Sequence, residues 1–438
     1  MADGRAPTEA AAGGDRDAGR AASAAERVAR ESYGRLVSYL AARWRSIESA
    51  EDALSDALAR ALDVWQRTGV PTDPGAWLLR AATNRLVDEY RRRDTAARAH
   101  RTMVAEIDRR IETVEELALN EAVPDERLTL LFLAAHPAID ETVRAPLMLQ
   151  TVLGLTSERI AALFLTAPAT MSKRLVRAKT KIRKAGISFA APDERERRRR
   201  TPAVLEAIYA VYTGSWDGGD APGAEESAGA QEALWLARIV AESMPRDAEA
   251  LGLRALLTYI EARRASRRDV AGAYVPLERQ DHQRWDLDRI RAAEEILMRA
   301  RRMNSVGRYQ IEAAIQSAHC ARAFGPPVDP STIAALYETL MHLAPSMGGA
   351  VSYAIARSRV AGAEAGLAIL DRWAERGSAY QPYWAAKAEL LRRKAQGAAD
   401  DTLREAAREA YRNALRLTRD EATRSFLTDR MTAAGLAP

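Results

Sequence analysis

The chain has 438 residues, 47% of them hydrophobic, which is enough for about two to four domains with buried cores. Cys320 is the one cysteine, so an internal disulfide and a cysteine-rich zinc site are excluded, as expected in a reducing cytoplasm. No run of about 18 apolar residues occurs, and the first residues lack the apolar stretch of a signal peptide, so we expect neither a membrane span nor secretion.

The charge is unevenly distributed along the chain. The net charge of +5 is modest for this length, but no acidic residue lies between Pro168 and Pro192. That stretch contains Lys173, Arg174, Arg177, Lys179, Lys181, Arg183 and Lys184. A second basic run follows at 197–200, whereas Glu and Asp dominate the stretch from Glu106 to Glu126. Local basic character of this kind is expected of a nucleic-acid footprint.

The spacing of apolar residues predicts an all-α protein. Nearly every long segment repeats apolar residues at three- and four-residue intervals, and strands are not needed to explain the pattern. Composition divides the chain into a disordered tail (1–25), a helical bundle (26–94), an acidic linker (95–125), a compact helical block (126–187), a basic linker (188–200) and a large helical domain (201–438).

Residues 154–183 predict a helix-turn-helix. Thr156 or Ser157 can cap the first helix, which ends near Leu165 and buries Ile160, Leu163 and Phe164. Pro168 suits the first turn of the second helix, where its missing N–H costs nothing. The second helix then carries one apolar stripe, formed by Met171, Leu175, Ala178 and Ile182.

The other side of that second helix is polar and basic. A helix with one buried face offers the opposite face to a DNA major groove, where its N-terminal residues reach base edges. We therefore expect Thr170, Ser172 and Lys173 to contact bases. Residues further along would meet phosphates, which give affinity rather than sequence choice: Arg177, Lys179, Lys181 and Arg183. Arg174 lies on the same polar side and is a further candidate for contact with the DNA. A basic, solvated helix in an ordinary helical hairpin remains the alternative.

Two helices are predicted in the N-terminal block. Ser49 can cap the first, whose inner stripe is Leu54, Leu58, Ala61 and Trp65 while Asp52 and Asp56 stay polar. Asp73 can cap the second, which begins at Pro74 and turns Leu78, Ala82, Leu86 and Tyr90 inward. Its outer side carries Arg80, Asn84, Asp88, Arg91 and Arg92. Periodicity alone allows a plain helical bundle as the alternative.

Three motifs in order carry a family resemblance. AEDALSDAL, PTDPGAWLLRAATNRLVDEYRRR and TMSKRLVRAKTKIR together resemble regions 2 and 4 of the extracytoplasmic-function (ECF) sigma factors of bacterial RNA polymerase. The resemblance covers nearly all of residues 30–187. It implies that the 188–438 extension is the unusual part of this chain.

The resemblance also implies roles for single residues. Asp52 and Asp56 would dock on the β′ clamp helices of core RNA polymerase. The 67–75 loop would melt and capture the −10 region of promoter DNA together with Trp77, Arg80, Asn84, Asp88, Arg91 and Arg92. The helix-turn-helix would read the −35 element as duplex beside the β flap of the polymerase. The acidic linker resembles the sigma linker that threads through the enzyme.

Residues 383–418 have the length and small-residue spacing of a tetratricopeptide repeat. The spacing rests on Ala385, Ala388, Leu391, Ala407, Tyr411, Ala414 and Leu417. A degenerate unit precedes it at 333–373, so we expect a solenoid that holds a protein or peptide partner. With segments 277–286 and 307–319, the arrangement resembles the ECF subgroup that has a C-terminal tetratricopeptide-like domain and is often associated with small DGPF-type proteins.

Several positions depart from that subgroup or invite another interpretation. Ala134 and Ala135 stand where the subgroup suggests cysteines, and Pro146 is expected to kink or shorten its helix. The stretch VYTGSWDGG stands where the subgroup suggests a sequence similar to Asn-Glu-Gly-Tyr. Gln280, Arg284, Trp285 and Asp286 are expected to form a buried polar brace between helices.

We expect no enzyme, metal site or cofactor. His319 and Cys320 are adjacent on a helix and so point apart, and the histidines show no metal spacing. The sequence therefore favours a sigma factor that recruits RNA polymerase to promoters under control of its C-terminal domain. Two alternatives stay open: a ligand- or partner-responsive helix-turn-helix regulator, and a repeat scaffold with a non-initiating sigma-like module.

Overall fold

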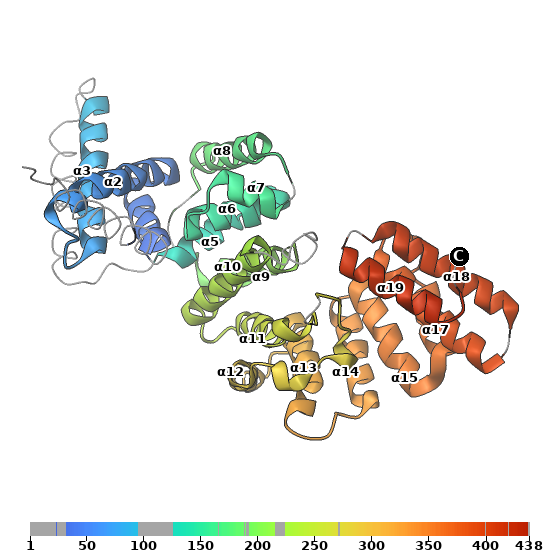
Figure 1. Cartoon of the computed structure of the whole chain (residues 1–438). Coiled ribbons are helices and arrows are strands. Elements are labelled where there is room, and N and C mark those ends of the chain that lie inside the picture. Colours follow the sequence, from blue (N-terminus) through green and yellow to red (C-terminus); the bar gives the residue numbers. More distant parts are fainter. Residues whose placement is uncertain are drawn as a thin grey trace, which may run out of the picture. The chain divides into compact units, whose positions relative to one another are not determined.

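The computed structural model describes residues 23, 32–94, 126–164, 166–187, 189, 192–214, 224–269, 272–398, 400–418 and 420–436. Within these residues every regular element is a helix, as the sequence predicts (Figure 1). The chain forms two compact units, Met1–Ala207 and Ile208–Pro438, which are described in turn. Two predicted segments lie outside the described residues: the acidic linker and, apart from residue 23, the N-terminal tail.

The first unit begins with an N-terminal block of three helices. Residues 32–44 are helical and are followed by α2 (Ile47–Thr68) and α3 (Pro74–Asp94), which pack on each other. The expected inner stripes are present, with Leu54, Ala61 and Trp65 of α2 and Leu78, Ala82 and Leu86 of α3 buried. Leu58 and Tyr90 are only half-buried.

The starts of α2 and α3 test two predicted caps. Asp73 caps α3 as expected, because its Oδ1 accepts the Ala76 N–H at 2.8 Å. The prediction for α2 was wrong: Ser46, which has extended backbone angles, accepts the Ser49 N–H through its Oγ. Ser49 already lies in the first turn, so it is the residue whose N–H is capped.

A block of four short helices follows, named here the helix-turn-helix block after the motif predicted for it. It consists of α5 (Arg127–Ala134), α6 (Glu141–Leu153), α7 (Ser157–Leu163) and α8 (Pro168–Lys184). Thr156 caps α7 by accepting the Arg159 N–H, and Pro168 begins α8, both as predicted. Of the predicted inner face of α7, Ile160 is buried, but Leu163 and Phe164 are half-buried.

Pro146 does not shorten its helix, so of the two expected effects, a kink or a shortening, the shortening is absent. It is buried inside α6, and the helix continues beyond it to Leu153. The missing N–H removes one bond to the carbonyl of Thr142, four residues earlier. Thr142 is exposed in the first turn of α6, so water can satisfy that carbonyl.

One helix crosses the division between the two units. α9 (Glu194–Gly214) contains the basic run 197–200, which is therefore helical. Arg200 forms an ion pair with Glu196 one turn earlier and donates to the Phe132 carbonyl of α5 at 3.4 Å. The start of α9 thus belongs to the first unit.

The second unit is built from helices that pack largely on their neighbours along the chain. They are α10 (Ala224–Ser243), α11 (Ala248–Ala262), α12 (Leu287–Arg301), α13 (Arg308–Cys320), α14 (Pro330–Leu343), α15 (Met347–Asp371), α16 (Ala374–Gly377), α17 (Gln381–Ala398), α18 (Asp401–Leu417) and α19 (Glu421–Ala433), with 3₁₀ turns at Arg264–Ser266, Leu277–Arg279, His282–Arg284 and Ala321–Ala323. α15 consists of two helical stretches, because Ala361 and Gly362 have non-helical angles. Gly362 has a φ of 84°, a conformation that favours glycine.

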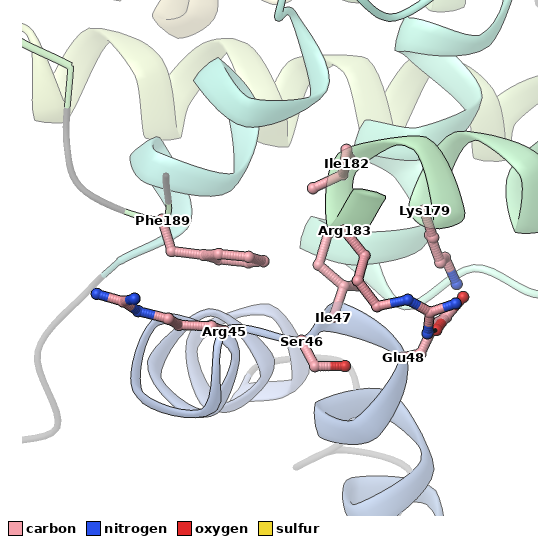
Figure 2. Close-up of a pocket in the computed structure, with 8 residues that line it drawn as sticks. All are labelled: Arg45, Ser46, Ile47, Glu48, Lys179, Ile182, Arg183 and Phe189. Atoms are coloured by element: carbon pink, nitrogen blue, oxygen red, sulfur yellow. Dashed lines mark hydrogen bonds and ion pairs between the residues drawn. The ribbon is translucent and has the colours of Figure 1, made fainter. Parts of the chain in front are cut away.

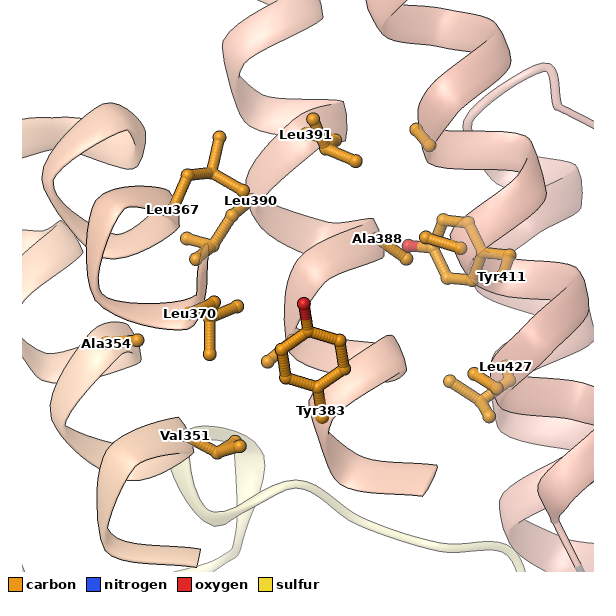
Figure 3. Packing of buried hydrophobic residues seen from close by; sticks show 14 of the residues in the cluster. Val351, Ala354, Leu367, Leu370, Tyr383, Ala388, Leu390, Leu391, Tyr411 and Leu427 are labelled. Atoms are coloured by element: carbon orange, nitrogen blue, oxygen red, sulfur yellow. The ribbon is translucent and has the colours of Figure 1, made fainter. Parts of the chain in front are cut away.

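The last helices share one apolar core (Figure 3). Leu367 and Leu370 of α15 face Tyr383 and Leu390 of α17, and Tyr411 of α18 packs on the other side. The residues that carried the predicted repeat are buried at Ala388, Leu391, Ala407, Tyr411 and Ala414, and half-buried at Ala385 and Leu417. α17 and α18 thus form the helix pair that their spacing predicts.

The predicted polar brace is only partly present. Gln280 and Trp285 are buried, and Arg322 lies 4.6 Å from the centroid of a Trp285 ring. Arg284 and Asp286 are exposed, and Asp286 instead caps α12 by accepting the Arg289 N–H. The prediction of burial was wrong for these two residues, because Arg284 ends an exposed 3₁₀ turn and Asp286 stands at the exposed start of α12.

None of the described helices combines the length and the apolar composition required to cross a lipid bilayer.

We predict that Glu389 makes the folding stability of the second unit depend on pH in the acid range. Burial alone would raise the pKa of this carboxyl, but hydrogen bonds from Arg392, Arg430 and Arg393 outweigh it and lower the pKa to about 2. Because the folded pKa lies below the ordinary value of 4.5, the stabilisation is complete above that value and is lost as the pH falls toward 2.

Hydrogen exchange of α17 amides between pH 2 and 6 would measure this dependence. Glu389→Gln should flatten the dependence across that window, whereas Glu375→Gln, at an exposed position on α16, should leave it as in the parent. Equal pH profiles for the parent and Glu389→Gln would contradict the prediction.

Candidate nucleic-acid and polymerase interface

α8 presents a polar, basic face opposite its buried stripe. Met171, Leu175, Ala178 and Ile182 are buried, as the periodicity predicts. The side chains on the other side are exposed and are those expected at the −35 element: Thr170, Ser172, Lys173, Arg174, Arg177 and Lys181. Pro168 starts the helix, so Thr170 and Ser172 lie in its first turns, where a recognition helix meets base edges.

Lys179 differs from the other basic residues of α8. Its ammonium forms an ion pair with Glu51 of α2, and the side chains of Lys179 and Glu51 are only 9% and 12% exposed. Burial raises the pKa of the Glu51 carboxyl, and the charge of Lys179 opposes that rise. In this arrangement Lys179 does not join the exposed face, so its expected phosphate contact is not available.

Arg183 makes a second ion pair across the same boundary. It pairs with Glu48 of α2, and these two side chains are more exposed than Lys179 and Glu51 (Figure 2). Lys179, Arg183 and Glu48 line a small pocket, and its lining also includes Ile47 and Ile182. The sequence interpretation missed Glu48 and Glu51, because no local pattern links residues so far apart in the chain.

α3 carries the residues expected to handle the −10 region. Arg80, Asn84, Asp88 and Arg91 follow at three- and four-residue spacing and are exposed on one side, and Arg92 is exposed beside them. Trp77 is half-buried, with its ring 5.5 Å from that of Trp65 in an edge-to-face contact. Its position is therefore fixed by the core of α2.

The acidic side of α2 holds the two residues expected to contact the polymerase. Asp52 and Asp56 are both exposed. The Asp56 carboxylate accepts a hydrogen bond from Arg85 of α3 at 2.7 Å, and this bond raises the pKa of the arginine. Asp56 is thus oriented by α3, a partner that the sequence interpretation did not identify.

The environment of Cys320 does not suit a nucleophile. The thiol is buried, and burial raises its pKa to about 11, so it is protonated at neutral pH. Burial, with Arg263 and Arg322 nearby, lowers the pKa of the adjacent His319 to about 4. Among the described residues, no group of three or more His, Cys, Asp or Glu side chains is placed to hold a metal ion.

Comparison with known proteins places this geometry in context. Residues 29–95, which span the N-terminal block, match the model of sigma-70 region 2. Residues 200–301 match a family of unknown function (DUF6596). An uncharacterized protein of Rhizobium meliloti (strain 1021) is 36% identical over 365 residues, covering 83% of this chain and 85% of the relative. No solved structure matches the chain.

The chain thus contains a domain similar to sigma-70 region 2, and further helices follow this domain along the chain. The chain belongs to the same family as the rhizobial protein.

We predict that the exposed face of α8 binds DNA through phosphates in a salt-dependent way. Each lost phosphate contact should reduce the slope of log affinity against log salt by about 0.9. Arg177→Gln and Lys181→Gln should each produce a change of that size, because both side chains are exposed. Fluorescence anisotropy of a promoter duplex at several salt concentrations measures the slope, and an unchanged slope in both variants would remove this face from the interface.

Proposed function

We propose that the protein is a sigma factor of the ECF kind that recruits core RNA polymerase to promoters. In this proposal region 2 opens the −10 region, the helix-turn-helix block acts as region 4 on the −35 duplex, and the second unit regulates both. The observation that carries the proposal is the order of its parts. A domain similar to sigma-70 region 2 precedes a predicted helix-turn-helix, whose second helix has an exposed basic face.

The geometry of the N-terminal block supports the role in promoter opening. Trp77 is held against Trp65 at the start of α3, and exposed polar residues extend along the helix from it. A fixed aromatic ring beside hydrogen-bonding groups suits a base that has left the duplex stack. A regulator that binds only duplex DNA would need neither feature. Asp52 and Asp56 on the neighbouring helix would meet the β′ clamp helices.

The second unit supports a regulatory role through its architecture. Its helices pack in sequence, as in tetratricopeptide-like solenoids, which bind protein or peptide segments along one surface. The unit is larger than any single block of the sigma-like part, although it carries none of the residues assigned to DNA or polymerase. We therefore assign it to control of the sigma module by a protein or peptide partner.

Transcription in vitro with core RNA polymerase and a promoter library tests the proposal. We expect transcripts that depend on the protein and are lost in Asp52→Arg, because a positive charge replaces an exposed acid at the polymerase contact. Asp63→Arg makes the same charge change at another exposed position of α2 and should retain activity. Lys173→Glu should lower initiation about 10- to 100-fold, the range for loss of one specific base contact.

Two other results would point to the alternatives. Duplex binding without any initiation would indicate a helix-turn-helix regulator of another class. Failure to bind either DNA or core polymerase would leave a helical scaffold with an inactive sigma-like module.

A truncation tests the regulatory assignment of the second unit. The chain should end after Ala207, since a stop near residue 190 would also remove the contact of Arg200 with the Phe132 carbonyl. We expect the truncated protein to initiate at a different rate from the full chain at equal polymerase concentration. Equal rates and equal polymerase affinity would remove the regulatory assignment.

A further inference from the structure

An irregular segment joins α11 to α12 in the second unit, and its middle part is a loop with adjacent ends (drawn in yellow in Figure 1). Residues 267–269 and 272–280 are the described part of this loop, named here the bridging loop. The Ser266 hydroxyl donates to the Asp281 carbonyl at 3.0 Å, which ties the two ends together. Trp285 is buried just beyond, so the base of the loop is anchored. Compact loops of this kind frequently carry function.

The bridging loop contacts a helix that comes much later in the chain. Arg268 forms an ion pair at 3.1 Å with Asp420, the residue that caps α19. Tyr274, paired with Arg268 in an antiparallel β-bridge, places its ring 5.4 Å from that of Phe426 on α19 in an edge-to-face contact. The loop therefore lies against the start of the last helix.

A second contact of the loop lies on a basic surface. Glu278 forms an ion pair with Arg359 of α15, which among the described residues has no other carboxylate within 4.0 Å. Burial and the nearby charge of Arg393 on α17 lower the pKa of Arg359. Arg393 and Arg430 of α19 share one carboxylate, that of Glu389. The helices α15, α17 and α19 thus each contribute an arginine, and Glu278 offsets part of their charge.

The contacts of the bridging loop are weak enough to be exchanged. The side chains of Arg268 and Asp420 are 34% and 29% exposed, and those of Arg359 and Glu278 are 31% and 57% exposed. Ion pairs with this exposure contribute little to stability and are screened by salt. The loop stays in place because its anchored base keeps its local concentration at the surface high. A segment of another protein with matching side chains can therefore compete with it.

We infer that α15, α17 and α19 form a binding surface for an acidic protein segment, and that the bridging loop occupies this surface as a ligand within the chain. The partner segment would carry an aromatic residue and, four positions later, an acidic residue, as Tyr274 and Glu278 do in the loop. Stacked helices bind such segments along one surface. The inference rests on the regulatory role proposed for the second unit and names the partner chemistry for it.

Binding of a peptide copy of the loop to the full chain tests the inference. The probe is a fluorescent peptide of residues 266–281 closed into a ring, because these ends are adjacent in the protein. In the recipient chain, Tyr274→Ala/Glu278→Ala removes contacts of the resident loop and leaves the surface unchanged. Fluorescence anisotropy should show at least tenfold tighter binding of the peptide to this open variant than to the parent, whose own loop competes.

Charge reversal on the open variant identifies the surface. Arg359→Glu should weaken binding of the unchanged peptide at least tenfold, and a peptide with Glu278→Arg should restore the affinity. Arg357→Glu makes the same charge change at another exposed position of α15 and should leave binding of the unchanged peptide as it was. Phe426→Ala should weaken binding of the unchanged peptide, because it removes the ring that Tyr274 contacts. Circular dichroism of each variant checks that the helices remain formed.

The inference and the proposed function fail in different assays. Equal binding of the peptide to the parent and to the folded open variant, or binding to neither, would overturn the inference. It would also be overturned if Arg359→Glu bound the Glu278→Arg peptide no better than the unchanged one. These measurements use neither DNA nor polymerase, so absence of initiation would overturn the proposed function and leave the inference in place. Where both hold, the peptide should alter initiation by the open variant at a concentration at least tenfold lower than by the parent.

Discussion

The burial of one stripe of α8 is the constraint on which the candidate DNA interface depends. Met171, Leu175 and Ile182 are covered by the neighbouring helices, so the helix can rotate only at the cost of exposing them. This fixes Lys173 and Arg177 in solvent on the opposite side. The same constraint places Lys179 at the margin of the buried stripe, where a second block can cover it.

Local patterns predicted the elements of the fold well. The cap at Asp73, the cap at Thr156 and the start of α8 at Pro168 each follow from interactions within four residues, and each is present. Ser46 and Ser49 are both able to cap α2, and the choice between them depends on where the preceding turn ends. Pro146 is tolerated because the carbonyl that it leaves unpaired lies in an exposed first turn.

Contacts between distant residues set the limit of prediction for the candidate site. The local sequence predicts that Lys179 and Glu51 lie on helices. Their pairing cannot be predicted in this way, because it requires contact between two blocks whose residues are 128 positions apart in the chain. The pairing of Asp56 with Arg85 bridges two helices in the same way. Periodicity identifies which side of a helix is polar, whereas the partner of a polar side chain depends on tertiary packing.

The helix at 32–44 and α6 approach each other so closely that a Cβ on Gly34 would overlap the carbonyl oxygen of Val152. Backbone atoms meet at Gly34 and the Tyr33 ring packs at Gly154, and these contacts of shape are not themselves screened by salt. The ion pairs of Lys179 and Arg183 weaken as salt rises, most of all the more exposed Arg183–Glu48 pair. The first unit is therefore held by contacts of shape and contacts of charge, and only the second kind responds strongly to ionic strength.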